Sequence, residues 1–183
     1  MSRLPPPRAA NSGPDEPAFP PARRVTQSPA VARREADTPS SAPVAASVVA
    51  ACIARHARER GEASRLDPQR VHDLLFLCQG YSLATHGRPL FTGRLLASPG
   101  GVSCPDAPEP HDDPHAGDGP EELRSVVAHV WEKFGGMSPP NLQTRVRSHV
   151  WCVQEMAGGG PDLSADAEAM EMAFRLAVRQ GLI

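Results

Sequence analysis

Residues 67–91 read DPQRVHDLLFLCQGYSLATHGRPLF, and this stretch decides the fold class. Asp67 can cap the free N–H groups of a helix start, and Pro68 suits the first helical position because it lacks an N–H. Apolar residues then recur at the spacing of one helical face: Val71, Leu74, Leu75 and Cys78. The other faces also carry apolar side chains: Phe76, Leu77 and Leu83. A helix that is apolar on most sides has neighbours all around it, so the stretch predicts a central helix.

Two glycines occur in this stretch, one inside the predicted helix and one at its end. Gly80 interrupts it at a cost of about 1 kcal/mol relative to alanine, which predicts that another backbone comes close there. Gly87, directly after His86, closes the helix.

The flanking segments predict further helices and one β element. Residues 43–60 carry an apolar stripe at helical spacing, and residues 88–104 combine apolar pairs with turn-forming Thr92-Gly93 and Pro99-Gly100-Gly101. Helix-start signals then occur at Pro120, at Ser138 with Pro139, and at Ser164. The apolar pattern of the helix that follows Ser138 consists of Leu142, Val146, Val150 and Trp151. The sequence therefore predicts a mainly α fold, a compact bundle of about five helices with a short β-hairpin-like element after the second helix.

The remaining segments are too polar or too rich in proline to pack. Residues 1–42 are dense in Pro, Ser, Ala and Arg without apolar periodicity, which predicts a disordered tail before a helical domain over residues 43–183. Residues 105–119, rich in Pro, Asp and His, predict a flexible loop within that domain. The first 30 residues hold no apolar run of the kind a secretory signal peptide needs, so we expect a cytoplasmic protein that does not enter the membrane.

The stretch Val71–Phe91 resembles the signature of Panacea domains, which is close to LxKLLYFAQGWxLAxxGxPLF. Ten residues match it directly: Leu74, Leu75, Gln79, Gly80, Leu83, Ala84, Gly87, Pro89, Leu90 and Phe91. Further on, residues 130–135 (VWEKFG) are similar to the VWEKYG of that family. The departures fall in the middle segment, where Ser98, Gly100 and Val102 replace a tryptophan, a tyrosine and a proline, and at Asp73, which replaces a lysine. The resemblance therefore implies a divergent member (SocA-like or GepA-like) with a kept scaffold and a remodelled recognition surface.

Panacea domains are antitoxins that pair with unrelated toxins, and a SocA-like branch delivers its toxin to a Clp-type protease. The resemblance implies a non-enzymatic protein-binding module without a cofactor, whose partner is a toxin-like protein encoded by a neighbouring gene. Aromatic residues and arginine dominate protein interfaces. We therefore expect Tyr81, Arg88 and Phe91, beside the β element, to be partner-binding residues, with roles in the core and in capping as the alternative.

Residue sets that could support chemistry are weak. Cys104, His111 and His115 have a spacing that a zinc site could use, but a fourth ligand and a shaped loop are missing. His149 and Cys152 lie three residues apart on one helix, where packing explains them better than catalysis. We expect no catalytic residue, no metal site and no cofactor.

A DNA-binding regulator is the alternative function. The formal net charge of −2 does not favour a nucleic-acid binder. Arginines do cluster, however, around the turn between the first two helices: Arg55, Arg58, Arg60, Arg65 and Arg70. Arg145 and Arg147, expected to be exposed, form a second basic patch. A basic face is the first requirement for DNA binding, so this alternative depends on the exposure of these guanidinium groups.

Overall fold

Five α-helices and two small pairs of strands make up residues 42–107 and 119–183, the part of the chain that the computed structural model describes. The helices are α1 (Ala46–Glu59), α2 (Pro68–His86), α3 (Glu121–Val130), α4 (Pro139–Met156) and α5 (Ala167–Arg179). The strands are β1 (Val44–Ala45), β2 (Phe91–Thr92), β3 (Leu96–Ser98) and β4 (Gly101–Ser103). A 3-10 turn, η1 (Ala63–Arg65), precedes α2, and a π-helix, η2 (Trp131–Gly135), continues α3. The predicted helical bundle with a hairpin after the second helix is confirmed. Residues 1–41 of the predicted tail and residues 108–118 of the predicted loop lie outside the described residues.

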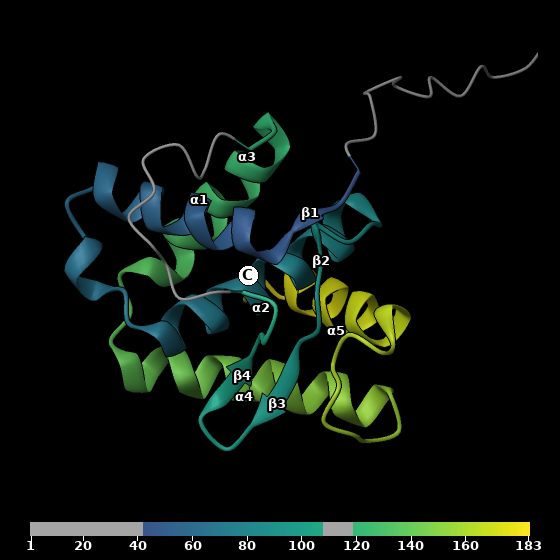
Figure 1. Ribbon diagram of the computed structural model, residues 1–183. Coiled ribbons are helices and arrows are strands. Elements are labelled where there is room, and N and C mark those ends of the chain that lie inside the picture. The colour runs from purple at the N-terminus through teal and green to yellow at the C-terminus, as the bar shows by residue number, and fades with distance from the viewer. Residues whose placement is uncertain (1–41, 108–118) are drawn as a thin grey trace, which may run out of the picture. The chain divides into compact units, whose positions relative to one another are not determined.

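Helix α2 is the central element, and it begins where the sequence predicts. The Asp67 side chain accepts a 2.8 Å hydrogen bond from the N–H of Arg70, and Pro68 is the first helical residue. Figure 1 shows α1 and α3 on one side of α2, and α4 and α5 on the other. Its apolar residues are fully buried on every face: Val71, Leu74, Leu75, Phe76, Leu77 and Cys78. The helix ends at Gly87, which adopts a left-handed conformation with φ 67° and donates its N–H to Leu83.

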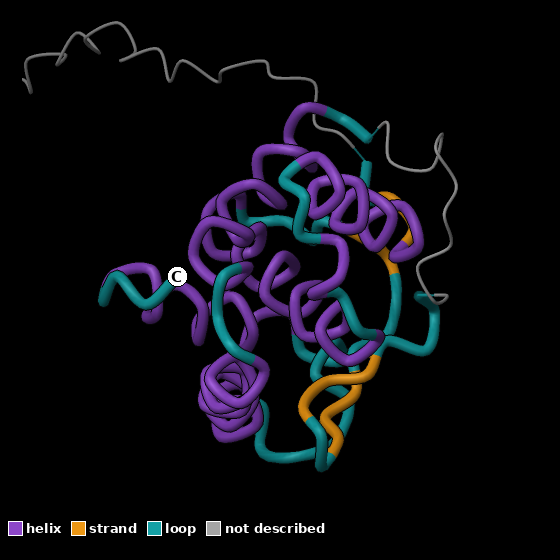
Figure 2. The backbone as a smooth tube through the Cα atoms, turned by 90° about the vertical axis from the view of Figure 1, so that its left-hand side faces the viewer, coloured by secondary structure: helices purple, strands orange, loops and turns teal. Residues whose placement is uncertain are grey.

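The first strand pair attaches the segment after α2 to the residues that precede α1. Val44 and Ala45 pair in parallel with Phe91 and Thr92, so α1 begins at Ala46 and not at Pro43 as the sequence predicts. Strands β3 and β4 form an antiparallel hairpin. Figure 2 shows this hairpin as the longer pair of orange strands, beside the helices rather than within them.

Gly80 is indeed a point of close approach, but the neighbour is a side chain rather than a backbone. The ring of Phe174 from α5 lies over Gly80, and a Cβ atom there would be 2.3 Å from the ring carbons. Phe174 is fully buried and packs edge-on against Phe76, with ring centroids 5.2 Å apart. The glycine therefore allows α5 to pack closely on the central helix.

Arg70 belongs to the core, which corrects its assignment to a basic surface patch. Its guanidinium is buried, and Nη2 donates to the carbonyl oxygens of Gly135 at 2.6 Å and Met137 at 2.8 Å. These carbonyls follow the end of a helix, where no intrahelical donor is available. Arg70 thus ties the end of η2 to α2.

The start of α5 is also corrected. The predicted cap, Ser164, instead bonds Asp162 and accepts a 3.2 Å hydrogen bond from the N–H of Leu95. Asp166 caps the helix, because its side chain accepts a 2.9 Å hydrogen bond from the N–H of Ala169.

Asp73 connects α2 to the hairpin. Its buried carboxylate accepts hydrogen bonds from Gln69 Nε2 at 2.9 Å and from the Val102 N–H at 3.3 Å. Burial raises the pKa of Asp73 to about 6, and the two hydrogen bonds only partly offset that rise.

We expect Gly80→Ala to lower the free energy of unfolding by about 1–3 kcal/mol, because the added methyl group would overlap the Phe174 ring. Urea denaturation measures this loss. Gly136→Ala is the matched control, since Gly136 has a negative φ and no described neighbour within 4 Å of an added Cβ. Equal stability of the two variants would show that Phe174 does not pack on Gly80.

We also expect the stability of the protein to depend on Asp73 between about pH 4 and 6. The pKa of Asp73 in the folded protein exceeds its unfolded value near 3.9, so its favourable contribution is complete below about pH 4 and lost as the pH rises to about 6. The loss is on the order of 2–3 kcal/mol. The free energy of unfolding of Asp73→Asn, measured by denaturation across this pH range, should not show this loss. If the free energy of unfolding depended on pH in the same way in the variant and the wild type, the burial of this carboxyl group would be contradicted.

Candidate functional site

The amide of Gln79 holds the segment that follows α2. Its Oε1 atom accepts hydrogen bonds from the N–H groups of Leu90 at 3.0 Å and Phe91 at 3.1 Å. Its Nε2 atom donates to the Phe91 carbonyl at 3.3 Å. The buried Ser82 hydroxyl donates to the Arg88 carbonyl at 3.0 Å. Residues 88–91 are thereby fixed against the last turns of α2, which sets the direction of the Arg88 side chain.

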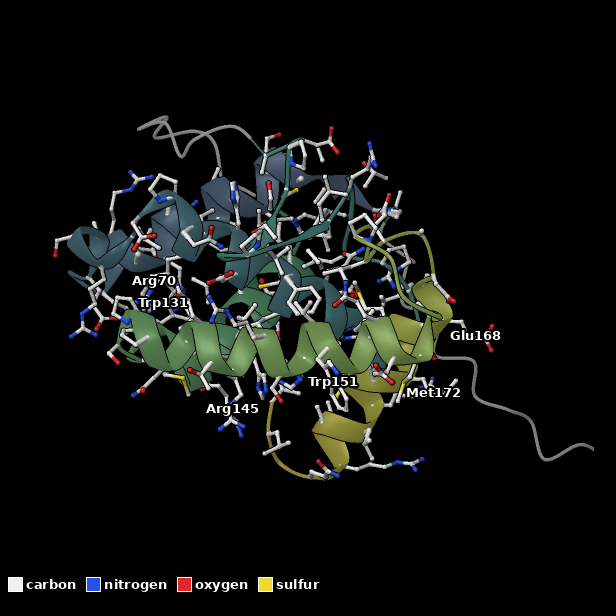
Figure 3. The ribbon with its side chains drawn as sticks, turned by 90° about the horizontal axis from the view of Figure 1, so that it is seen from below. Arg70, Trp131, Arg145, Trp151, Glu168 and Met172 are labelled. Atoms are coloured by element: carbon white, nitrogen blue, oxygen red, sulfur yellow. The ribbon has the colours of Figure 1, made fainter. Side chains whose placement is uncertain are left out.

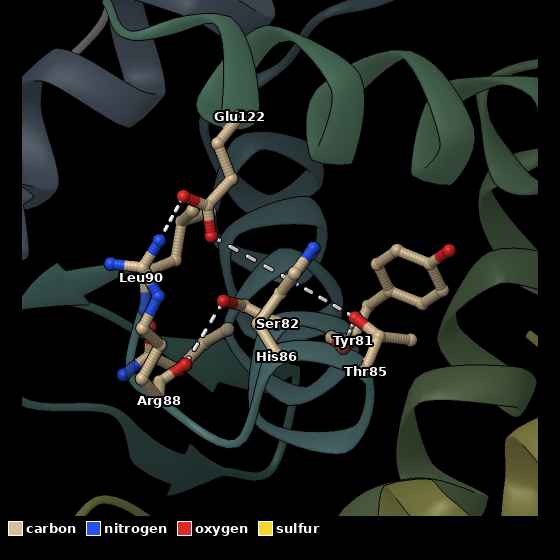
Figure 4. Close-up of polar contacts among 8 residues, drawn as sticks. Tyr81, Ser82, Thr85, His86, Arg88, Leu90 and Glu122 are labelled. Carbon is tan, nitrogen blue, oxygen red and sulfur yellow. Dashed lines mark hydrogen bonds and ion pairs between the residues drawn. The ribbon is translucent and has the colours of Figure 1, made fainter. Parts of the chain in front are cut away.

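A group of side chains gathers where the end of α2 meets α3, all of them half-buried except the exposed His86, and we call it the α2–α3 face: Tyr81, His86, Arg88, Glu122 and His129. The rings of Tyr81 and His129 stack, with centroids 4.2 Å apart and an interplanar angle of 15°. Thr85 Oγ1 donates to the Tyr81 carbonyl at 2.7 Å and contacts His86 Nδ1 at 3.1 Å. Figure 4 shows the ring of Tyr81 and the side chain of Arg88 flanking this group.

Glu122 is the charged centre of the α2–α3 face. Its carboxylate forms an ion pair with Arg88 and lies 3.8 Å from His86 Nδ1. Glu122 stands in the first turn of α3, where the helix dipole favours a negative charge. Both side chains of the Arg88–Glu122 pair are half-buried, so the pair is partly shielded from water and holds a defined geometry.

The three residues predicted to bind a partner do not share one environment. Tyr81 and Arg88 both lie on the α2–α3 face, at opposite sides of it. Phe91 is only 1% exposed and belongs to the hydrophobic core. For Phe91 the structure therefore favours the alternative role in the core. Its burial follows from its place in β2, where it pairs with Val44.

The predicted arginine patch is largely neutralised within the chain. Three of its members form ion pairs, namely Arg55 with Glu59, Arg60 with Glu132, and Arg65 with Glu62. Arg70 is buried, and Arg147 donates to the carbonyl of Pro99 at 2.8 Å. Arg145 is half-buried rather than exposed. The paired carboxylates reduce the net positive charge of this surface, so this arrangement does not favour DNA binding.

The three buried cysteines, Cys52, Cys78 and Cys104, are poor nucleophiles in this fold. Burial raises the pKa of Cys52 to about 11 and also raises that of Cys104, whereas thiolate chemistry needs a lowered pKa. His149 stacks on Phe174 in the core, and burial, with a smaller effect of Arg145, lowers its pKa to about 4. His111 and His115 lie outside the described residues. Among those described, no group of three or more His, Cys, Asp or Glu side chains is placed to bind a metal ion.

A groove of about 350 Å³ lies between α1 and α3. Cys52, His56 and Ser125 contribute to its lining. Arg55 and Arg124 also line it, and each pairs with a glutamate of its own helix. The groove therefore offers no concentrated charge and no activated thiol.

Trp151 lies on the surface, although the sequence pattern assigned it to the apolar side of its helix. Its side chain is 63% exposed, the largest exposed fraction among the large apolar residues that the structure describes. The buried side of α4 instead consists of Leu142, Val146, His149, Val150 and Val153. Trp151 lies on the opposite, solvent-exposed stripe, which we call the α4 outer stripe: Asn141, Thr144, Ser148, Trp151 and Glu155. The regular spacing of three and four residues along this stripe could have revealed it.

Comparison with protein-family models, curated proteins and solved structures finds no match for this chain. The resemblance of residues 71–91 to Panacea domains therefore stays a prediction. Within the described parts of the chain, no helix has both the length and the apolar character required to cross a bilayer.

We expect Phe91→Ala to lower the free energy of unfolding by about 3–5 kcal/mol, as for other buried phenylalanines. Tyr81→Ala should cost clearly less, because the Tyr81 ring is only half-buried. Chemical denaturation of both variants tests the assignment of Phe91 to the core and Tyr81 to the surface. The reverse order of the two losses would contradict it.

Proposed function

We propose that this chain is a non-enzymatic protein-binding module of the antitoxin type, which holds a toxin-like protein through the α2–α3 face. The observation that carries the proposal is that the stacked Tyr81–His129 pair and the Arg88–Glu122 ion pair lie on one face of the protein. Tyrosine and arginine are enriched among the residues that dominate binding energy. Tyr81 and Arg88 also belong to the stretch that resembles Panacea domains.

The geometry of this face suits binding because its side chains are ordered before a partner arrives. Stacking on His129 fixes the Tyr81 ring, and the ion pair with Glu122 fixes the Arg88 guanidinium. Side chains that are already ordered lose less entropy on binding, so more of their contact energy appears as affinity. The hydrogen bonds of Gln79 to residues 90 and 91 extend this order to the backbone that carries Arg88.

The cysteine environments support a binding function over a thiol enzyme. Burial raises the pKa of Cys52, Cys78 and Cys104, so each remains a protonated thiol near neutral pH. The DNA-binding alternative is less well supported, because most of the arginines on which it depends pair with carboxylates or with backbone carbonyls.

Co-expression with the product of the neighbouring gene tests the proposal. We expect that product alone to arrest growth and the intact chain to restore it. Tyr81→Ala and Arg88→Ala should each weaken the complex at least about tenfold in calorimetry, and the double variant should lose the rescue. Arg58→Ala, which removes an exposed arginine of α1, is the matched control and should rescue normally. A neighbour that is harmless and does not bind the chain would contradict the proposal.

The lifetime of the partner distinguishes the two antitoxin mechanisms. If the chain presents the partner to a Clp-type protease, co-expression should shorten the partner's half-life in a pulse-chase experiment. If it neutralises the partner by binding alone, the half-life should stay the same or lengthen.

A further inference from the structure

The α4 outer stripe carries a protruding ring and a hollow on the same helix face. Trp151 stands out into solvent in the second half of α4. In the first half, an open hollow of about 460 Å³ is lined by Met137, Asn141, Thr144, Arg145 and Ser148. The residues of the stripe within this hollow are small and polar, so they leave room above the helix.

The ring and the centre of the hollow lie on opposite sides of Ser148, at similar distances from it. Trp151 is three residues after Ser148, and Thr144 is four residues before it. These offsets amount to about 4.5 Å and about 6 Å along the helix axis. A two-fold axis through Ser148, perpendicular to α4, would therefore exchange the positions of the ring and the hollow.

Charge along α4 is also uneven, because its first half carries Arg145 and Arg147 and its second half carries Glu155. Arg145 lies on the side of the hollow, whereas Glu155 lies beyond Trp151, toward the end of the helix. Figure 3 shows Arg145 toward one end of α4, Glu168 of α5 toward the other, and Trp151 and Met172 between them. An antiparallel copy of the helix would bring the basic half of each chain opposite the acidic half of the other.

We infer that two copies of this chain associate through the α4 outer stripe in an antiparallel, two-fold symmetric dimer. Trp151 of each copy enters the hollow of the other and lies beside the partner's Arg145, where a guanidinium favours the face of an indole ring. Ser148 meets the partner's Ser148 on the axis, and the small side chain allows the helices to approach. Because the two-fold axis places each ring in the hollow of the other copy, both hollows are filled, and the contact is isologous and closes at two copies.

The apolar part of this contact extends beyond α4. Met172 of α5 is 53% exposed and lies on the same side of the molecule as Trp151. Tryptophan, methionine and arginine are enriched at protein interfaces relative to the rest of the surface. The inference does not depend on the proposed function, since the α2–α3 face uses none of these residues.

Sedimentation velocity of the full chain, from about 1 µM to 1 mM, tests the inference. We expect a reversible monomer–dimer equilibrium whose dissociation constant rises at least about tenfold in Trp151→Ala. Ser148→Arg should prevent association, because it sets two arginines against each other on the axis. Ser125→Arg makes the same change at an exposed position of α3 and should leave the equilibrium unchanged. Circular dichroism checks that each variant is folded.

Acrylamide quenching provides a second readout. The chain has two tryptophans, and Trp131 is buried with its Nε1 atom bonded to Glu62, so quenching reports chiefly on Trp151. We expect quenching to decrease as the concentration of wild-type protein rises, and to stay constant in Ser148→Arg. A wild-type chain that remains monomeric, a dimer that Trp151→Ala leaves intact, or assembly into larger open-ended species would each overturn the inference.

Discussion

The packing of Phe174 against Gly80 is the contact on which the rest of this structure depends. It allows α5 to lie directly on α2 and to bury that side of the central helix. A larger residue at position 80 would keep the two helices apart. With α1 and α3 on its other side, α2 loses contact with water over most of its length. Burying several large apolar side chains on one helix supplies much of the free energy that offsets the entropy of ordering the chain.

A central helix of this kind also determines where polar groups can be used. Gln79, Asp73 and Arg70 project from α2 and are buried, and each satisfies backbone groups of a different neighbouring segment. Gln79 holds residues 90 and 91, Asp73 holds β4, and Arg70 holds the end of η2. Buried polar groups without partners are costly, so these contacts specify how the segments attach to the helix. The α2–α3 face lies at the end of this arrangement, where α2 finally reaches the surface.

Local signals in the sequence predicted the elements of this fold well. Asp67 with Pro68, and Ser138 with Pro139, mark helix starts through neighbouring residues alone, and both starts are correct, although only the Asp67 side chain accepts a capping hydrogen bond. The errors concern contacts between residues distant in sequence. Arg70 reads as a surface arginine until the carbonyls of residues 135 and 137 are known to lie beside it. Ser164 and Asp166 are both good caps, and the bond from Leu95 to Ser164 decides between them. For the candidate site, sequence reasoning found Tyr81 and Arg88 but not their partners His129 and Glu122, which come from another helix.

Native-state hydrogen exchange of the intact chain tests the central role of α2 most directly. If α2 is enclosed by the other helices, the amides of residues 74–79 should exchange only through global unfolding and should be the slowest in the protein. Gly80→Ala should accelerate the exchange of these amides and of the amides of α5 together, because the contact between Phe174 and Gly80 packs the two helices against each other. Exchange of residues 74–79 at the rate of the solvent-exposed ends of α4 would contradict the account.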